Sequence, residues 1–303
     1  RTHEVIPIDN CLIQNKKSEE IAKFIIEFIK EKNISIYDEK TGKGLVRHIV
    51  TKVGIKTGEI MCVIVINGHK IPNENELVEN LKTKYPEIKA IVKNVNMKNT
   101  NVILGQENIN LYGNGYIEDI LGEYKFKISP LSFYQVNPVQ AEKLYNLGVS
   151  MAEITKNDVV FDLYCGIGTI SLFMSKFAKK VYGIEIVEEA VKMAKENAQN
   201  NNVSNTEFFA GDVEIVLDDM INNKGLKADV VMFDPPRKGL DKKSIDNILN
   251  IRPKKIVYIS CNPATLIRDL ADFENEYDIK TIIPVDMFPF TSHVECVATL
   301  QLK

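Results

Sequence analysis

The second half of the sequence alternates regularly between short apolar runs and helix-like stretches, and this alternation limits the possible folds most strongly. The expected strands are 159–163, 180–184, 206–209, 229–233 and 256–260, and the expected helices include 170–177 and 187–200. Strands that alternate with helices pair in parallel, and the right-handed crossover rule makes such a sheet doubly wound. The sequence therefore predicts an α/β domain with helices on both faces of one sheet.

The two ends of the chain depart from this pattern. Extended segments at 279–285 and 293–302 predict a closing hairpin that adds an antiparallel strand to the parallel sheet. Before residue 130 the sequence indicates a capped helix, a hairpin, a second helix and further strands, over 18–32, 45–53 with 59–66, 74–84, 88–95 and 117–128. We expect a smaller α+β domain over residues 1–130 and the α/β domain over residues 131–303.

Composition limits the size, the compartment and the metal content. The 303 residues, 45% of them hydrophobic, can fill two ordinary cores. No run is long enough to span a membrane and the N-terminus is no signal peptide, so we expect a soluble, cytoplasmic protein. The five cysteines form no CxxC pair and the four histidines have no paired spacing. We therefore predict neither a disulfide framework nor a metal site.

The net charge and the first residues of the sequence each lead to a further expectation. A net charge of −3 gives no bulk attraction to nucleic acid, although local patches such as Arg237-Lys238 can still contact phosphates. The chain begins at Arg1 rather than Met, and residues 2–8 have no cap or apolar core of their own. We expect a fragment of a longer protein that lacks an upstream domain. A monomer is the working expectation for the oligomeric state.

A glycine-containing loop follows the first strand of the predicted sheet and opens its first helix. It reads Asp162-Leu163-Tyr164-Cys165-Gly166-Ile167-Gly168-Thr169. Glycines at this point let the backbone approach a ligand closely. The third glycine of a dinucleotide fingerprint is replaced by Ser171, and Asp162 would repel a pyrophosphate. The loop therefore favours S-adenosylmethionine over NAD.

Acidic residues follow three later strands at the same edge of the sheet. Glu185 ends the second strand, 19 residues after Gly166, the first glycine of the loop, where a carboxylate can bind both ribose hydroxyls of an adenosine. Asp212 is a candidate for the adenine amino group, with an ordinary turn as the alternative. Asp234-Pro235-Pro236-Arg237 follows the fourth strand. Its two prolines fix a rigid turn that aims Asp234 and Arg237 into the crevice.

The stretch Ser260-Cys261-Asn262-Pro263 places a thiol between a buried strand and a helix. Asn262 is a good N-cap, and Pro263 suits the first helical position. The positive end of the helix would favour thiolate over thiol at Cys261, which makes this residue a candidate nucleophile. A free cysteine taken alone is more often a small buried core residue, and the neighbouring motifs reverse that preference.

Taken together, these motifs resemble the RNA uracil-5-methyltransferase family, which forms 5-methyluridine in ribosomal and transfer RNA. The resemblance covers nearly all of residues 129–303, and residues 1–128 look like the family's central RNA-facing domain. It rests on Phe133-Tyr134-Gln135-Val136-Asn137-Pro138, Asp162–Gly166, Asp234–Arg237, Ser260–Pro263 and His293-Val294-Glu295. It implies a class I methyltransferase fold with S-adenosylmethionine as cofactor. The small RNA-binding β-barrel that often precedes this region in the family is not in the sequence.

The resemblance also implies chemical roles. Cys261 would add to uracil C6 and create an enolate whose C5 attacks the methyl sulfonium, after which Glu295 would remove the C5 proton. Asp234 and Arg237 would orient the uracil or balance the enolate charge. The implied cofactor contacts are Gln135, Tyr164, Gly166, Gly168, Thr169, Glu185, Asp212 and Asp234.

Substrate contacts are implied for Phe133, Gln135, Arg237 and Arg47. Phe133 would stack on a base turned out of the RNA, and Arg47 would contact phosphate. As isolated residues, Phe133 would be core and Arg47 an ordinary surface arginine. Some family members hold an iron–sulfur cluster through four cysteines. Cys11 looks like the last such ligand without its partners, so no cluster is expected in this chain.

The leading hypothesis is therefore methylation of C5 of a uridine in 23S rRNA with S-adenosylmethionine. Transfer RNA is the first alternative substrate, and the motifs do not decide between the two. Cysteine-based cytosine-5 methylation is chemically close, but the Asp-Pro-Pro-Arg and His-Val-Glu motifs look like those of the uracil enzymes. The other classes are a non-catalytic RNA-binding or RNA-folding factor of the same fold and an NAD-dependent oxidoreductase.

Overall fold

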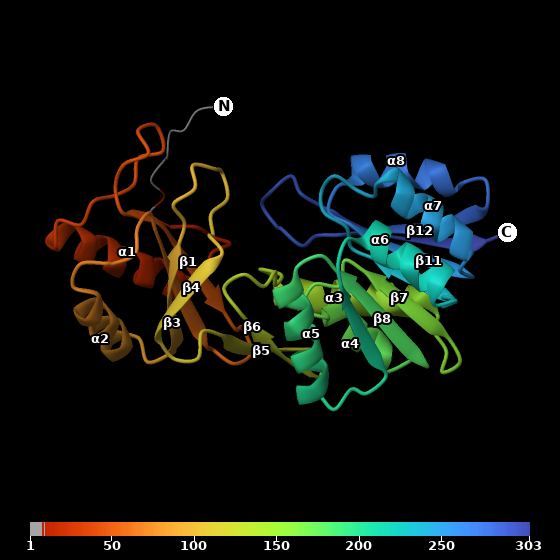
Figure 1. The fold of residues 1–303 in the computed structure, drawn as a ribbon, viewed down its shortest axis with the longest axis horizontal. Coiled ribbons are helices and arrows are strands. Elements are labelled where there is room, and N and C mark those ends of the chain that lie inside the picture. The colour runs from red at the N-terminus through yellow and green to blue at the C-terminus, as the bar shows by residue number, and fades with distance from the viewer. Residues whose placement is uncertain (1–7, 9) are drawn as a thin grey trace. The chain divides into compact units, whose positions relative to one another are not determined.

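The computed structural model describes residue 8 and residues 10–303, which divide into two compact units. The first unit runs to Ile120 and includes Lys127–Leu131, whereas the second consists of Leu121–Phe126 and Ser132–Lys303. Most of the opening segment that was expected to lack a cap and a core lies outside the described residues. Each unit has a sheet of its own (Figure 1). Each also has its own hydrophobic core.

The second unit is built on a seven-stranded sheet in the order β12-β13-β11-β10-β7-β8-β9 (Figure 1). The strands are β7 (Val159–Leu163), β8 (Lys180–Glu185), β9 (Thr206–Ala210), β10 (Val230–Phe233), β11 (Lys255–Ser260), β12 (Tyr277–Val285) and β13 (Glu295–Leu302). β7 to β11 pair in parallel, while β13 pairs antiparallel with both β11 and β12. The predicted mostly parallel sheet with an antiparallel C-terminal hairpin is confirmed.

Helices cover both faces of this sheet because successive strand residues point to opposite sides. On β10, Val230 and Met232 join one core, and Val231 and Phe233 join the other. The first face carries α3 (Pro138–Ala152), α4 (Thr169–Ser175) and α5 (Glu188–Asn200). The second carries α6 (Val213–Asp218), α7 (Lys242–Ile251) and α8 (Pro263–Phe273), with a π-helical turn at Asp219–Asn223. The sheet is therefore doubly wound, as predicted.

The first unit contains a four-stranded sheet in the order β1-β2-β3-β4, packed against two helices. Its elements are α1 (Lys16–Glu31), β1 (Val46–Val53), β2 (Ile60–Ile66), α2 (Glu74–Lys84), β3 (Ile88–Val95) and β4 (Glu107–Tyr112). β2 is buried along its whole length and β3 along nearly all of it, so these central strands form the core. β5 (Ile117–Leu121) and β6 (Tyr124–Ile128) form a separate two-stranded sheet.

Three details before residue 130 differ from the prediction. α1 begins at Lys16 rather than at Ser18, because the Asn15 side chain caps it by accepting a hydrogen bond from the Lys17 N–H at 2.9 Å. The single strand expected over 117–128 is two strands, because the chain turns at Gly122 with a φ of 62°. β4 was not predicted, because this strand is short and partly exposed and contains two asparagines, which are depleted in strands.

Candidate active site

The loop after β7 turns sharply before α4 begins, because three of its residues have left-handed backbone. Their φ angles are 66° at Tyr164, 56° at Gly166 and 82° at Gly168. A Cβ at Gly168 would lie 3.1 Å from Ala194 Cβ and from a ring carbon of Phe208, so both space and conformation require glycine there. A Cβ at Gly166 would meet nothing within 4 Å, so the loop has an open side at that residue.

Glu185, at the end of β8, folds back onto this loop. Its carboxylate accepts hydrogen bonds from the Gly166 N–H at 3.1 Å and from the Val187 N–H at 2.9 Å. The parallel pairing of β7 with β8, which sets Leu163 beside Ile184, brings the two together. The glycine loop and the acidic strand end therefore form one local structure.

Asp162 lies beneath the loop and is only 1% exposed. Its Oδ2 accepts a hydrogen bond from the Ser171 hydroxyl at 2.5 Å, whereas its Oδ1 has no hydrogen-bond partner among the described residues. Burial, and to a smaller extent the Glu185 carboxylate, raises the pKa of Asp162 to about 7. A buried oxygen without a donor is costly, so Oδ1 marks a position where a ligand can supply a donor or a positive charge.

Strand register brings the predicted chemical groups together at the carboxyl edge of the sheet. β11 runs antiparallel to β13 with Ser260 opposite Cys296, so the next residues outward are Cys261 and Glu295. β10 runs parallel to β11 and ends immediately before Asp234, which therefore lies at the same edge. Residues that are distant in the sequence thus become neighbours.

Two carboxyl groups at this edge hold their protons unusually strongly. Burial, followed by the charges of Glu295 and Asp162, raises the pKa of Asp234 to about 8. Burial also raises the pKa of Glu295 to about 7, although the nearby Arg237 guanidinium acts in the opposite direction. Near neutral pH both groups can therefore either donate or accept a proton.

Cys261 follows β11 directly, as predicted, but its protonation differs from the prediction. Asn262 caps α8 by accepting a hydrogen bond from the Ala264 N–H at 3.1 Å, and Pro263 opens the helix. Burial, followed by the carboxylates of Glu295 and Asp234, nevertheless raises the pKa of the Cys261 thiol. The prediction of a thiolate was therefore wrong, because desolvation and the two acidic neighbours outweigh the effect of Arg237.

Tyr145 of α3 lines a small cavity and was not among the predicted site residues. The cavity walls are Leu121, Phe133, Tyr134, Gln135, Pro138, Ala141, Tyr145 and Thr169. The Tyr145 hydroxyl is hydrogen-bonded to Gln135 and Thr169, and burial, followed by the charge of Asp234, raises its pKa. Two predicted cofactor contacts therefore share one buried hydroxyl. Asn137 as N-cap and Pro138 at the helix start are the sequence signals that could have revealed α3.

Phe133 lies in the same cavity wall but is 73% exposed. An aromatic residue of the core is normally buried, because burial removes its large apolar surface from water. The core alternative is therefore wrong for Phe133, and its ring is accessible to a planar partner.

Two other predicted residues make local structural contacts. Asp212 is the N-cap of α6 and accepts a hydrogen bond from the Glu214 N–H at 2.9 Å. Arg47, on β1 of the first unit, donates to the carbonyl oxygens of Asn96 and Lys98, both at 2.8 Å, and its guanidinium lies over the Tyr37 ring at 4.3 Å. Roles in binding adenine and phosphate therefore remain predictions for these two residues.

Residue 8 and residues 10–303 contain no group of three His, Cys, Asp or Glu side chains that could hold a metal ion. Cys11 has a partly exposed free thiol, and its backbone N–H donates a hydrogen bond to the Glu19 carboxylate at 2.9 Å. No helix in this part of the chain is both long and apolar enough to cross a membrane.

The strand order, the glycine loop after β7 and the acidic end of β8 define a class I methyltransferase fold. The structure is similar to that of the M. jannaschii tRNA m1G37 methyltransferase, with a TM-score of 0.54 at 18% sequence identity. The similarity covers 88% of this chain and 78% of that chain. At so low an identity it concerns the fold alone.

Sequence similarity identifies the family. The family described as tRNA (uracil-5-)-methyltransferase matches residues 55–303. An uncharacterized RNA methyltransferase of Caldanaerobacter subterraneus is 50% identical over 301 residues, which are 99% of this chain and 66% of that protein. The crystal structure of Pyrococcus abyssi tRNA (uracil-54, C5)-methyltransferase in complex with S-adenosyl-L-homocysteine has a TM-score of 0.80 at 31% identity, covering 98% of this chain and 70% of its own. The chain belongs to the tRNA (uracil-5-)-methyltransferase family, which confirms the resemblance seen in the motifs.

Proposed function

We propose that this chain is the catalytic part of an RNA uracil-5-methyltransferase, which transfers a methyl group from S-adenosylmethionine to C5 of a uridine. The supporting observation is the convergence of Cys261, Glu295 and Asp234 at the carboxyl edge of the sheet, in a member of this family. A protein that kept the fold only for RNA binding would have no need to desolvate two carboxyl groups beside a thiol, because their desolvation is unfavourable.

The residues at the glycine loop fit S-adenosylmethionine, which would supply the methyl group and a positive charge. The unpaired Asp162 Oδ1 suits a cationic or hydrogen-bonding group, and Gly166 leaves the loop open. Glu185 already faces this loop and can accept from ribose hydroxyls. The other proposed contacts are Gln135, Tyr164, Gly168, Thr169, Asp212 and Asp234.

The first chemical step requires Cys261 to lose its proton. Unprotonated Asp234 can accept that proton, which leaves Glu295 free for a later step. As the sulfur–C6 bond forms, electrons of the uracil C5=C6 double bond move toward the C4 oxygen. Protonated Asp234 or the Arg237 guanidinium can donate a hydrogen bond to that oxygen. The electron-rich C5 would then take the methyl group while the methyl–sulfur bond breaks, which leaves S-adenosylhomocysteine.

The second step restores the aromatic base and frees the enzyme. C5 now carries both the new methyl group and its original proton. Glu295 removes the proton, the electron pair re-forms the C5=C6 bond, and the Cys261 thiolate leaves C6. A pKa of about 7 places Glu295 near the value that suits a general base at neutral pH.

Trapping with 5-fluorouridine tests this proposal. The protein is mixed with S-adenosylmethionine and RNA containing 5-fluorouridine, and intact mass is measured alongside a Cys261→Ala variant. Fluorine at C5 prevents proton removal, so a methylated covalent complex should accumulate in the unchanged protein and not in the variant. Demonstrated cofactor binding without any adduct would contradict the cysteine mechanism and favour a non-catalytic RNA-binding factor. An adduct with 5-fluorocytidine RNA alone would indicate cytosine-5 methylation.

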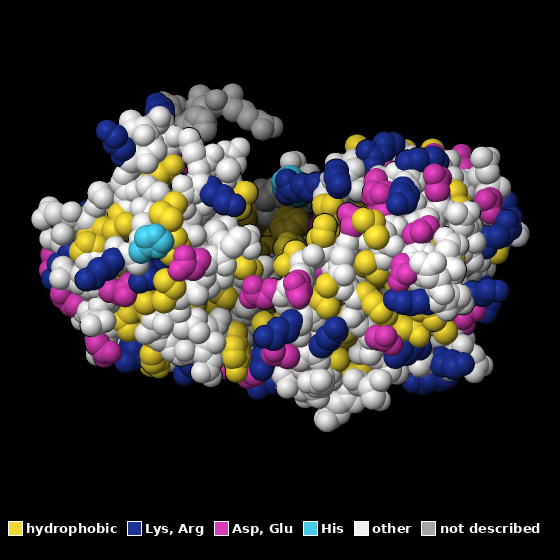
Figure 2. Space-filling view, in the orientation of Figure 1, with side chains coloured by type: hydrophobic (Ala, Val, Ile, Leu, Met, Phe, Trp, Pro, Cys, Tyr) yellow, Lys and Arg dark blue, Asp and Glu magenta, His cyan; other side chains and the backbone are white. Residues whose placement is uncertain are grey.

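Two RNA classes enter the assay as substrates. The leading hypothesis from the sequence is 23S rRNA, although the motifs do not distinguish it from tRNA, and the matching family and the Pyrococcus abyssi protein carry tRNA in their names. On the face shown in Figure 2, basic and acidic side chains are mixed on each unit. RNA contact on that face would therefore depend on individual residues rather than on one basic patch. We further propose that residues 1–130 contact the RNA and residues 131–303 form the methyltransferase domain.

A further inference from the structure

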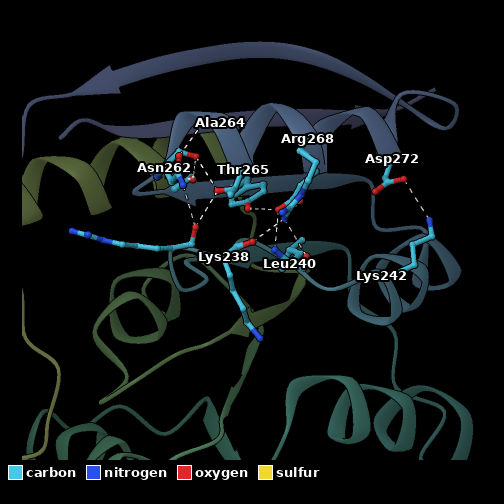
Figure 3. A network of polar contacts seen from close by, with 12 residues as sticks. Lys238, Leu240, Lys242, Asn262, Ala264, Thr265, Arg268 and Asp272 are labelled. Atoms are coloured by element: carbon cyan, nitrogen blue, oxygen red, sulfur yellow. Dashed lines mark hydrogen bonds and ion pairs between the residues drawn. The ribbon is translucent and has the colours of Figure 1, made fainter. Parts of the chain in front are cut away.

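Two separate segments carry Cys261, Asp234 and Arg237, and residues of helix α8 hold these segments together. One is the loop from Asp234 to Leu240, which follows β10, and the other is the turn that contains Cys261 and leads into α8. Figure 3 shows residues of α8 and its cap reaching toward the backbone of the loop. The Asn262 amide donates to the Arg237 carbonyl oxygen at 3.3 Å, and the Thr265 hydroxyl donates to the same oxygen at 3.4 Å.

Arg268, one turn further along α8, makes the shorter contacts. Its Nη2 donates to the Lys238 carbonyl oxygen at 2.8 Å and to the Leu240 carbonyl oxygen at 3.4 Å (Figure 3). Nε and Nη2 also donate to Asp269 Oδ1 at 2.8 and 2.5 Å. The planar guanidinium therefore connects a buried carboxylate with the loop backbone, which a lysine could not do in the same geometry.

Asp269 connects the loop with the strand beneath it. Its side chain is 1% exposed, and its Oδ2 accepts from the Leu240 N–H at 2.8 Å and from the Tyr258 hydroxyl at 2.7 Å. Tyr258 belongs to β11, the strand that leads to Cys261. One carboxylate thus fixes the end of the loop to the strand that carries the nucleophile.

Gly239 provides an independent sign that the loop is fitted to this pair. Its φ is 76°, and an added Cβ would lie 2.4 Å from Asp269 Oδ2 and 2.6 Å from Arg268 Nη2. The loop can approach the pair so closely only because this residue has no side chain. The contacts of the pair reach the loop through backbone atoms and leave the exposed Arg237 side chain available for a substrate.

We propose that Arg268 and Asp269 are positioning residues that hold the loop of Asp234 and Arg237 in register with Cys261. This inference rests on the proposed function, because it assigns the pair to the reaction of those three residues. Displacement of a reacting group by about 1 Å can slow a reaction by about 10²-fold, so a loosened loop would affect the rate more than binding.

Arg268→Ala tests the inference, with Arg268→Lys as a conservative variant and Asp272→Asn as a matched control. Asp272 lies on the same helix and pairs with Lys242 at 3.5 Å, on an exposed surface away from the loop (Figure 3). Because Arg268 has an exposed side chain, its replacement is less disruptive than that of the buried Asp269. Melting temperatures establish that each variant is folded.

Three measurements distinguish positioning from general damage: amide hydrogen exchange at Leu240, S-adenosylhomocysteine affinity, and the rate of adduct formation with saturating 5-fluorouridine RNA. We expect Arg268→Ala to speed exchange at Leu240 and to slow adduct formation about tenfold, with the affinity changed less than about twofold. Arg268→Lys should recover part of the rate, and Asp272→Asn should match the unchanged protein.

The outcomes separate this inference from the proposed function. If the wild-type protein and the Arg268→Ala variant form the adduct at the same rate, the positioning role alone is overturned. A loss of cofactor affinity as large as the loss of rate would also overturn it, in favour of a purely structural role. If the unchanged protein bound cofactor but formed no adduct, the proposed function itself would fail, and the positioning role in that reaction with it.

Discussion

Replacing Glu295 with glutamine should slow turnover strongly while making the protein more stable. Burial raises the pKa of this carboxyl from 4.5 to about 7, and its side chain is 4% exposed. At about 1.4 kcal/mol per tenfold change in proton affinity, the ionised form costs the folded state roughly 3 kcal/mol. The folded protein binds this proton more tightly than the unfolded chain does. Stability from neutral Glu295 is therefore complete below pH 4.5 and lost as the pH rises through about 7.

Glu295→Gln removes that pH dependence. Below pH 4.5 the variant and the unchanged protein should be about equally stable, whereas at pH 8 the variant should gain up to about 3 kcal/mol in free energy of unfolding. Loss of the general base should lower turnover by about 10²- to 10⁴-fold. Because Cys261 remains, a methylated covalent complex should persist even with ordinary uridine RNA.

Urea unfolding at several pH values and denaturing gels of the reaction test both effects. In the unchanged protein, release of the methylated RNA should be roughly tenfold slower at pH 6 than at pH 8, following deprotonation of Glu295 with a midpoint near pH 7. A Glu295→Gln variant that turns over at nearly the normal rate would refute the assignment of the base. Equal stability of the two proteins at pH 8 would refute the claim that burial of the ionised Glu295 carboxylate destabilises the fold.

Three further predictions concern the nucleophile, its acidic neighbour and the loop. Cys261→Ala should abolish methylation and adduct formation in the gel assay while S-adenosylhomocysteine affinity, measured by calorimetry, stays within about twofold, because the loss is of covalent chemistry. Asp234→Asn, which keeps a hydrogen-bond donor, should reduce the rate constant less than Asp234→Ala. Gly168→Ala should lower the melting temperature more than Gly166→Ala, because only at Gly168 would the Cβ meet side chains at 3.1 Å, with a cost of about 1–3 kcal/mol. Gly166→Ala should mainly weaken cofactor binding, since its Cβ would enter the open side of the loop.

The parallel sheet could be predicted from the sequence because its strands are buried on both faces. Such strands are continuous β-branched runs, as in Lys255–Ser260, and polar residues follow them where they reach the ligand edge. α3 was harder to predict, although Asn137 and Pro138 form a good helix start. With α3 missed, Tyr145 was missed as well, because its importance comes from the neighbours that tertiary packing gives it.

The pairing of Cys261 with Glu295 could not have come from local sequence. It depends on the antiparallel register of β11 and β13, and a glutamate at a strand start is by itself an ordinary exposed charge. The resemblance to the family implied that Glu295 acts as the base, whereas only the fold shows that Glu295 lies near Cys261. The protonation of Cys261 was wrong for a related reason. A helix terminus can be recognised in a sequence, whereas desolvation by distant segments and the charges of Asp234 and Glu295 cannot.

The carboxyl groups at the sheet edge form a connected series in which one group raises the pKa of the next. Glu185 raises the pKa of Asp162, Asp162 contributes to raising that of Asp234, and Glu295 contributes to raising that of Asp234 as well. Repulsion of this kind is relieved when a cation binds nearby, because the ionised forms then gain an attractive partner. A sulfonium ligand would therefore lower these pKa values and release protons, so its affinity should rise with pH between about 6 and 8. The same carboxyl groups that repel one another would thus select a positively charged methyl donor and prepare Glu295 to act as a base.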